Sequence, residues 1–171
     1  TFPATSHVLK WANLKPVFCD IDNETMNIDV AKIESLITPR TSAILGVHVF
    51  GTPCDVKKIN VIAKKNNLKV IYDAAHAFGV KIDNKSIGNY GDISMFSLHA
   101  TKLFHTAEGG VLTYNKKTLK KEIYYLKNFG IKNEEEIITA GINGKMNEIQ
   151  AALGLTLLKY MSKERAKRQA I

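Results

Sequence analysis

Short apolar runs alternate with amphipathic segments along most of the chain, and this alternation limits the possible folds more than any other feature. The apolar runs that we expect to form strands are residues 16–20, 42–49, 69–73, 93–97 and 110–114. Runs of this length between turn residues are typical of strands, and the amphipathic segments between them are typical of crossover helices. The pattern therefore predicts βαβ units and an α/β fold with a mostly parallel sheet.

Helices are expected between and after these strands. Asp29 and Asp55 each stand just before an amphipathic segment, where a carboxylate can cap the first turn of a helix. Apolar residues at intervals of three or four predict further helices around residues 119–126 and 146–160. Turn-forming residues are frequent in residues 82–91, which predicts a hairpin or a loop.

The composition is that of a globular protein, with 45% hydrophobic residues in 171. The sequence contains no apolar run of about 18 uncharged residues and no secretory leader, so we expect a soluble, cytoplasmic protein without a membrane span.

The net charge of +8 is compatible with nucleic acid, a membrane surface or a phosphorylated small molecule as partner. Cys19 and Cys54 lack the spacing of a metal or redox motif and are expected as free thiols.

The two ends of the sequence predict a fragment. The chain begins at Thr1 without an initiating methionine, and residues 163–170 at its other end still have the composition of a helix. No internal repeat, low-complexity tract or Pro/Ser-rich linker divides the sequence. We therefore expect residues 1–171 to form part of one larger domain.

Two ionisable residues at the ends of predicted strands indicate the chemistry. Asp73 closes the run 69–73, and Lys102 follows Ser97, the last residue of the run 93–97, by five positions. In open α/β sheets, ligands bind at the carboxyl ends of the strands. Pyridoxal phosphate (PLP) needs an amine for its aldehyde and a carboxylate facing its ring nitrogen, which must stay protonated for the ring to accept electrons. The pair therefore indicates a PLP enzyme.

Each of these residues also has a simpler interpretation. Asp73 could cap a helix that follows its strand, and Lys102 could be a solvated surface lysine. The sequence around Lys102, GDISMFSLHATKLFHTAEGG, favours a site, because a strand, a polar turn and a double-glycine turn surround the amine. Ser97 adds a hydroxyl that can donate to a phosphate oxygen.

Six motifs occur in order over nearly the whole chain: TFPAT, PVFCDIDNETMNID, ITPRTSAILGVHVFGTPCDV, VIYDAAHAFGV, GDISMFSLHATKLFHTAEGG and GINGKMNEIQAALGL. In this series the chain resembles the PLP-dependent sugar aminotransferases of the DegT–StrS type. The resemblance implies a three-layer αβα sandwich with a mostly parallel sheet, the large domain of the fold type I PLP-dependent transferases. It also implies that residues 1–171 are a partial PLP-binding large domain, without its phosphate-loop segment and the C-terminal small domain. Such a fragment is expected to be weakly active or inactive alone.

The resemblance assigns three roles around the cofactor ring and phosphate. Lys102 corresponds to the Schiff-base lysine, which also moves the proton between cofactor and substrate. Asp73 corresponds to the partner of the ring nitrogen. Ser97 corresponds to the serine that binds the phosphate.

Three further positions are assigned in the same way. His76 stands where relatives commonly have a glutamine that contacts the phenolic oxygen, and both side chains can donate a hydrogen bond. Phe2 corresponds to an aromatic residue that stacks on the ring. Asn143 corresponds to an asparagine that reaches the cofactor phosphate of the neighbouring subunit in a homodimer. From the residues alone, His76 and Phe2 could belong to the core, and Asn143 could end a turn.

The resemblance implies a transaminase that moves an amino group from an amino acid, glutamate as in relatives, to a keto group of a nucleotide-diphosphate-linked deoxysugar. The sequences of the last two motifs resemble most those of the branch that acts on deoxythymidine-diphosphate-linked 4-keto or 3-keto sugars. Relatives serve the synthesis of surface polysaccharide and glycosylated metabolites. A PLP-binding sugar dehydratase, in which histidine replaces the lysine, and a non-catalytic regulatory relative remain alternatives.

Other classes fit the sequence less well. A dinucleotide-binding oxidoreductase needs GxGxxG, and a P-loop protein needs GxxxxGK[ST]; the sequence contains neither motif. The basic balance leaves a nucleic-acid-binding module as a remote alternative. Most of the lysines lie on the polar faces of predicted helices, where a solvated surface is the ordinary explanation. The histidines His48, His99 and His105 have no regular ligand spacing, so no metal site is expected.

Overall fold

The computed structural model describes residues 2–171, which form two compact units. The first unit contains the described residues up to Ser97, together with Val111–Thr113. The second unit contains Leu98–Gly110 and Tyr114–Ile171. Each unit is described below by itself.

A four-stranded sheet lies at the centre of the first unit, with the strand order β1-β2-β5-β6. The strands are β1 (Ala43–Val47), β2 (Lys69–Asp73), β5 (Ile93–Ser97) and β6 (Gly110–Tyr114). β2 pairs in parallel with both β1 and β5, and Asp73 lies opposite Val47 on one side and Met95 on the other. The predicted α/β fold with a mostly parallel sheet is therefore confirmed.

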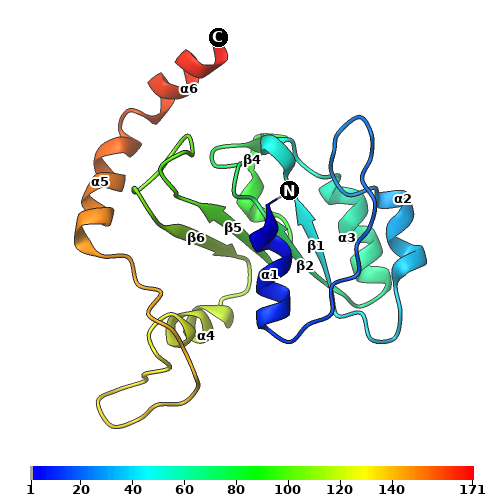
Figure 1. Ribbon diagram of the computed structural model, residues 1–171, viewed down its shortest axis with the longest axis horizontal. Coiled ribbons are helices and arrows are strands. Elements are labelled where there is room, and N and C mark those ends of the chain that lie inside the picture. Colours follow the sequence, from blue (N-terminus) through cyan, green and yellow to red (C-terminus); the bar gives the residue numbers. More distant parts are fainter. Residues whose placement is uncertain (1) are drawn as a thin grey trace. The chain divides into compact units, whose positions relative to one another are not determined.

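Two predicted helices, α2 (Val30–Ile33) and α3 (Val56–Lys65), cover one side of β1 and β2, as Figure 1 shows. α3 buries Val56, Ile59 and Ala63, and these residues belong to one core cluster with apolar side chains of the strands. The Asp55 carboxylate accepts a hydrogen bond from the Lys58 N–H at 2.9 Å, which satisfies a free donor in the first turn. The capping role expected of Asp55 is confirmed.

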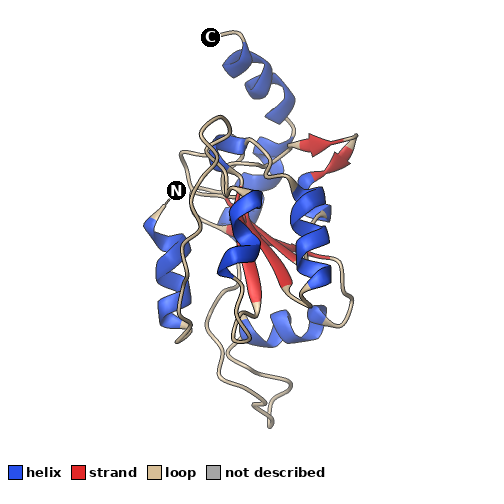
Figure 2. Ribbon diagram, turned by 90° about the vertical axis from the view of Figure 1, so that its right-hand side faces the viewer, coloured by secondary structure: helices blue, strands red, loops and turns tan. Residues whose placement is uncertain are grey.

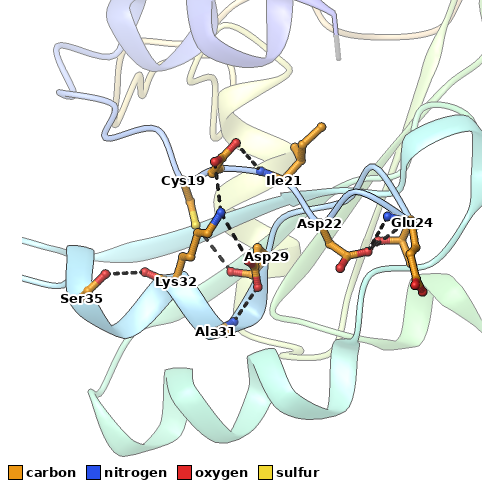
Figure 3. Close-up of polar contacts among 10 residues, drawn as sticks. Cys19, Ile21, Asp22, Glu24, Asp29, Ala31, Lys32 and Ser35 are labelled. Atoms are coloured by element: carbon orange, nitrogen blue, oxygen red, sulfur yellow. Dashed lines mark hydrogen bonds and ion pairs between the residues drawn. The ribbon is translucent and has the colours of Figure 1, made fainter.

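The start of α2 is held by a small network of polar contacts (Figure 3). The Asp29 carboxylate accepts from the Ala31 N–H at 3.0 Å, which confirms the predicted cap. The Lys32 ammonium lies 3.0 Å from Asp20 and 3.6 Å from Asp29. These ion pairs are exposed, so they contribute little to stability. α2 is short and continues as a 3₁₀ helix over Glu34–Leu36.

Two further 3₁₀ helices and a hairpin complete the connections of the first unit. The 3₁₀ helix Val49–Gly51 follows β1, and the 3₁₀ helix Ile87–Asn89 precedes β5. The hairpin consists of β3 (Lys81–Ile82) and β4 (Lys85–Ser86), which pair antiparallel as a separate two-stranded sheet (Figure 2). The prediction for residues 82–91 is confirmed.

Two features of the N-terminal part differ from the prediction. Residues 16–20 form no strand; the chain there makes only an isolated bridge between Ile21 and Ile28. Val17 and Phe18 are exposed, so their apolar character does not mark a buried strand here. The helix α1 (Pro3–Trp11) was not predicted, and none of its residues is buried. Pro3 at its first position was the available signal.

The second unit contains the helices α4 (Leu119–Leu126), α5 (Glu148–Leu158) and α6 (Met161–Gln169). The Asn147 side chain accepts from the Gln150 N–H and the Gln150 side chain accepts from the Asn147 N–H, so a capping box begins α5. All three helices confirm predicted segments, although the helix predicted over residues 146–160 is observed only over Glu148–Leu158. None of the helices within residues 2–171 is long and apolar enough to cross a membrane.

Candidate functional site

Asp73 is the best-defined polar residue at the carboxyl edge of the sheet. It is the last residue of β2, and only 7% of its surface is exposed. Its Oδ2 accepts a hydrogen bond from the Thr5 hydroxyl at 2.7 Å, and its Oδ1 accepts from the Ala75 N–H at 3.0 Å. The segment that follows forms turns, so Asp73 does not cap a helix.

Ser97 lies at the same edge of the sheet as Asp73. It ends β5, the neighbour of β2, two residues beyond Met95, which is the register partner of Asp73. Its side chain is half-buried. Because the carboxyl ends of parallel strands meet at one edge, the structure brings this hydroxyl and the Asp73 carboxylate to neighbouring strand ends.

His76 lies in the turn after β2 and is exposed, so it is not a core histidine. Its ring stacks on that of Phe50, with ring centroids 6.0 Å apart and planes within 6° of parallel. Phe50 is 86% exposed and has a left-handed backbone with φ of 51°. Gly51 continues this turn at φ of 86°, and a Cβ there would lie 3.0 Å from the His76 carbonyl oxygen. Phe50, which contacts the predicted site residue His76, was not among the predicted site residues.

Phe2 stands at the N-cap position of α1 and is 72% exposed, so it is not part of the core. Thr5, one turn further along α1, donates its hydroxyl to Asp73. The structure therefore connects the start of this helix to the residue predicted to face the cofactor ring. Thr5 was not among the predicted site residues.

Lys102 belongs to the second unit, within the loop that connects β5 to β6. Its N–H donates to the His99 carbonyl at 2.9 Å, and its side chain is half-buried. His99 Nδ1 lies 2.7 Å from Glu108 Oε1, and the Leu98 N–H donates to the Gly109 carbonyl at 2.8 Å. These contacts close the base of the loop that carries the lysine.

Asn143 also belongs to the second unit. It is exposed and forms an isolated antiparallel bridge with Asn128. Lys145 donates to the Asn128 side chain at 2.8 Å, next to this bridge. The predicted site residues are thus divided: Phe2, Asp73, His76 and Ser97 are in the first unit, and Lys102 and Asn143 are in the second.

His48 is a buried histidine at the end of β1 that the sequence analysis gave no role. Its Nδ1 accepts from the Cys54 N–H at 3.1 Å, and its ring stacks on Tyr72 at 4.6 Å. Burial lowers the pKa of His48 to about 4, although the charge of Asp73 acts in the opposite direction. The ring is therefore neutral at pH 7, with its proton on Nε2, which is buried without a hydrogen-bond partner.

The thiols and the metal-ligating groups suggest no further chemistry. Cys19 and Cys54 are both free, as predicted, and burial raises the pKa of the Cys54 thiol to about 12. A thiol that stays protonated is a poor nucleophile. Within residues 2–171, no group of three or more His, Cys, Asp or Glu side chains is arranged to hold a metal ion.

The donor set at the sheet edge fits PLP. A buried carboxylate can face a protonated ring nitrogen, and a hydroxyl at the neighbouring strand end can donate to a phosphate oxygen. The exposed ring of Phe2, also in the first unit, offers an apolar face for stacking. In the second unit, considered by itself, the amine of Lys102 is not engaged in any salt bridge among the described residues.

Comparison with known sequences gives a consistent result. The model of the DegT/DnrJ/EryC1/StrS aminotransferase family matches residues 1–171. The chain is 54% identical over 161 residues to the dTDP-4-amino-4,6-dideoxy-D-glucose transaminase of Shigella dysenteriae, covering 94% of this chain and 44% of that protein. It is 40% identical to the GDP-perosamine synthase of Escherichia coli O157:H7, covering 93% of this chain and 44% of that protein. The chain thus spans less than half the length of these relatives.

Comparison with solved structures agrees. DesI, solved in the presence of its TDP-sugar product, superposes with a TM-score of 0.89 at 41% identity, covering 95% of this chain and 42% of DesI. Spr1654 from Streptococcus pneumoniae, in its PLP form, has a TM-score of 0.89 at 28% identity, covering 95% of this chain and 47% of Spr1654. These likenesses confirm the fold class predicted from the sequence, that of the large domain of PLP-dependent transferases.

Proposed function

The chain belongs to the DegT/DnrJ/EryC1/StrS aminotransferase family, and from this premise we propose that the protein carrying it is a PLP-dependent sugar aminotransferase. It would move an amino group from an amino acid, glutamate, to the keto group of a nucleotide-diphosphate-linked deoxysugar. The observation that carries the proposal is the match of the family model over residues 1–171, which include both Asp73 and Lys102.

PLP supplies the electron-accepting ring in such an enzyme, and the residues of this chain hold and use it. Lys102 would provide the amine for the cofactor aldehyde and would act as base and acid at the reacting carbons. Asp73 would keep the ring nitrogen protonated through a charge-assisted hydrogen bond. Ser97 would donate its hydroxyl to the phosphate.

The other predicted residues orient the cofactor. Phe2 would stack on the ring, and His76 would donate a hydrogen bond to the phenolic oxygen, with its imidazole held by the stacking contact with Phe50. Asn143 would reach the phosphate of the neighbouring subunit, so the working protein would be a homodimer. The support for this arrangement is the donor chemistry of the side chains and their match to the family motifs.

The same family fold also suits a dehydratase or a regulatory protein that binds the cofactor without turnover. Lys102 favours transamination, because an amine that can both bond to the aldehyde and carry a proton serves both halves of an amine transfer. The 54% identity to a dTDP-4-amino-4,6-dideoxy-D-glucose transaminase favours a dTDP-linked 4-keto sugar as amine acceptor and surface polysaccharide synthesis as the setting.

The test is an amine-transfer assay on the complete gene product. Purified protein with PLP and glutamate should aminate a dTDP-linked 4-keto-6-deoxyhexose faster than its GDP-linked counterpart, with one 2-ketoglutarate formed per amino sugar. Lys102→Ala should abolish the product, whereas Lys116→Ala, at an exposed lysine, should leave the rate unchanged. Loss of water from the sugar without uptake of nitrogen would overturn the proposal in favour of a dehydratase.

A further inference from the structure

Thr5 makes an unusual contact for a helical threonine. Hydroxyl side chains inside helices usually bond back to a carbonyl of the preceding turn. Ser6 does so, donating to the Pro3 carbonyl at 3.1 Å. The Thr5 hydroxyl instead donates to Asp73 Oδ2 at 2.7 Å, which joins two residues 68 positions apart in the sequence.

This contact fixes the orientation of the Asp73 carboxylate. The Ala75 N–H, which donates to Oδ1 at 3.0 Å, belongs to the turn that follows Asp73 and moves with the end of β2. Thr5 donates from a separate element, so the two contacts together prevent rotation of the carboxylate about its Cβ–Cγ bond. Each carboxylate oxygen has two acceptor sites, so the carboxylate can still accept a further N–H donor.

The contact also holds α1. No residue of this helix is buried, so apolar packing contributes little to its position. Phe2 stands at the N-cap of α1, one helical turn before Thr5. A hydrogen bond from Thr5 to Asp73 therefore ties the start of the helix, and the exposed Phe2 ring, to the carboxylate at the sheet edge.

We propose that Thr5 is a positioning residue for the cofactor site: its hydroxyl orients the Asp73 carboxylate toward the ring nitrogen and fixes α1 so that Phe2 can stack on the ring. The proposal rests on the proposed function, because it takes PLP as the group that Asp73 faces. Thr5 itself acts through Asp73 and does not touch the cofactor.

The test measures cofactor binding by the complete apoprotein. Thr5→Val keeps the branched shape and removes the hydroxyl, and Thr5→Ser keeps the hydroxyl. Ser6→Ala is the matched control, because it removes a neighbouring hydroxyl that bonds within α1. Thr5→Val should raise the dissociation constant of PLP about tenfold, the effect of losing one hydrogen bond to a charged group, and the other two variants should stay within about threefold of wild type.

A second probe separates orientation from a general loss of order. The 1-deaza analogue of PLP has a carbon in place of the ring nitrogen, so it gains nothing from an oriented Asp73. Thr5→Val should therefore weaken PLP binding much more than binding of the 1-deaza analogue. Combined with Asp73→Ala, which removes the acceptor of the Thr5 hydroxyl, the Thr5→Val change should have no further effect on PLP affinity, because the two residues act as one unit.

The outcomes distinguish this proposal from the proposed function. Equal PLP affinity of wild type and Thr5→Val would overturn the role of Thr5 while leaving the aminotransferase in place. An equal loss of affinity for PLP and its 1-deaza analogue would overturn the orientation of Asp73 by Thr5. Failure of the wild-type protein to bind PLP would overturn the proposed function itself. If Thr5→Val does not fold, Thr5→Ala is measured in the same way and its result decides.

Discussion

Two ionisable side chains at the ends of neighbouring strands have opposite environments. Asp73 has a hydrogen-bond donor on each carboxylate oxygen. His48, whose backbone N–H donates to the Asp73 carbonyl at 2.9 Å, has a buried Nε2 with no hydrogen-bond partner.

The sequence pattern predicted Asp73 and Ser97 at strand ends, because apolar runs mark strands. It could not reveal Thr5, because the hydrogen bond to Asp73 depends on the three-dimensional path of α1.

The buried His48 predicts a pH dependence of stability. Its pKa is about 4 in the folded protein and about 6.5 in the unfolded chain, so the unfolded state binds more protons between these values. The contribution of the neutral His48 to the free energy of unfolding is therefore fully present above pH 6.5 and is lost as the pH falls toward 4. Between pH 7 and pH 5, the free energy of unfolding should fall by about 2 kcal/mol more in wild type than in His48→Gln.

Urea denaturation of both proteins at the two pH values measures this difference. His48→Gln is the suitable reference, because glutamine stays neutral over the whole range. Parallel losses of stability in the two proteins would contradict a neutral, buried His48.

At the scale of elements, local signals decided which predictions were right. Asp29 and Asp55 cap the helices that follow them, because a carboxylate before an amphipathic segment satisfies free N–H groups whatever the tertiary structure. Residues 16–20 have strand-forming side chains but no ladder partner, and pairing depends on distant parts of the chain. α1 was missed because its apolar residues do not face a core.

The cap of α3 can be tested directly. Asp55→Ala removes the acceptor of the Lys58 N–H and should destabilise the protein by about 1 kcal/mol. Asp55→Asn keeps a capping oxygen and should cost only a few tenths of that, apart from the loss of the exposed Lys58 ion pair. Thermal unfolding of the three proteins measures the effect. An equal loss in both variants would show that the charge, and not the cap, is what matters.

At the scale of the whole molecule, order is expected to be uneven. β2 is paired on both sides, and Val70 and Tyr72 on it are among the most buried core residues. Residues 132–140, in the second unit, are exposed throughout. Slow opening is expected where buried apolar packing surrounds paired backbone, and fast opening where it is absent.

Amide hydrogen exchange should therefore be slowest in β2 and fast in residues 132–140. The expected difference is several orders of magnitude, because exchange of β2 requires global opening whereas the exposed segment exchanges through local fluctuations. Mass spectrometry of peptides from the two segments, taken over a time course, provides the measurement. Similar protection in both would contradict the burial pattern of the structure.

Lys102 is proposed as the amine that bonds covalently to PLP. The direct measurement is borohydride reduction of the complete, PLP-loaded protein, which converts that bond into a stable one, followed by peptide mapping of the phosphopyridoxyl group. The added mass is expected on the peptide that contains Lys102, and none is expected on this peptide in Lys102→Ala. A phosphopyridoxyl group on a different lysine, or none on any lysine of a protein that transfers amines, would contradict it.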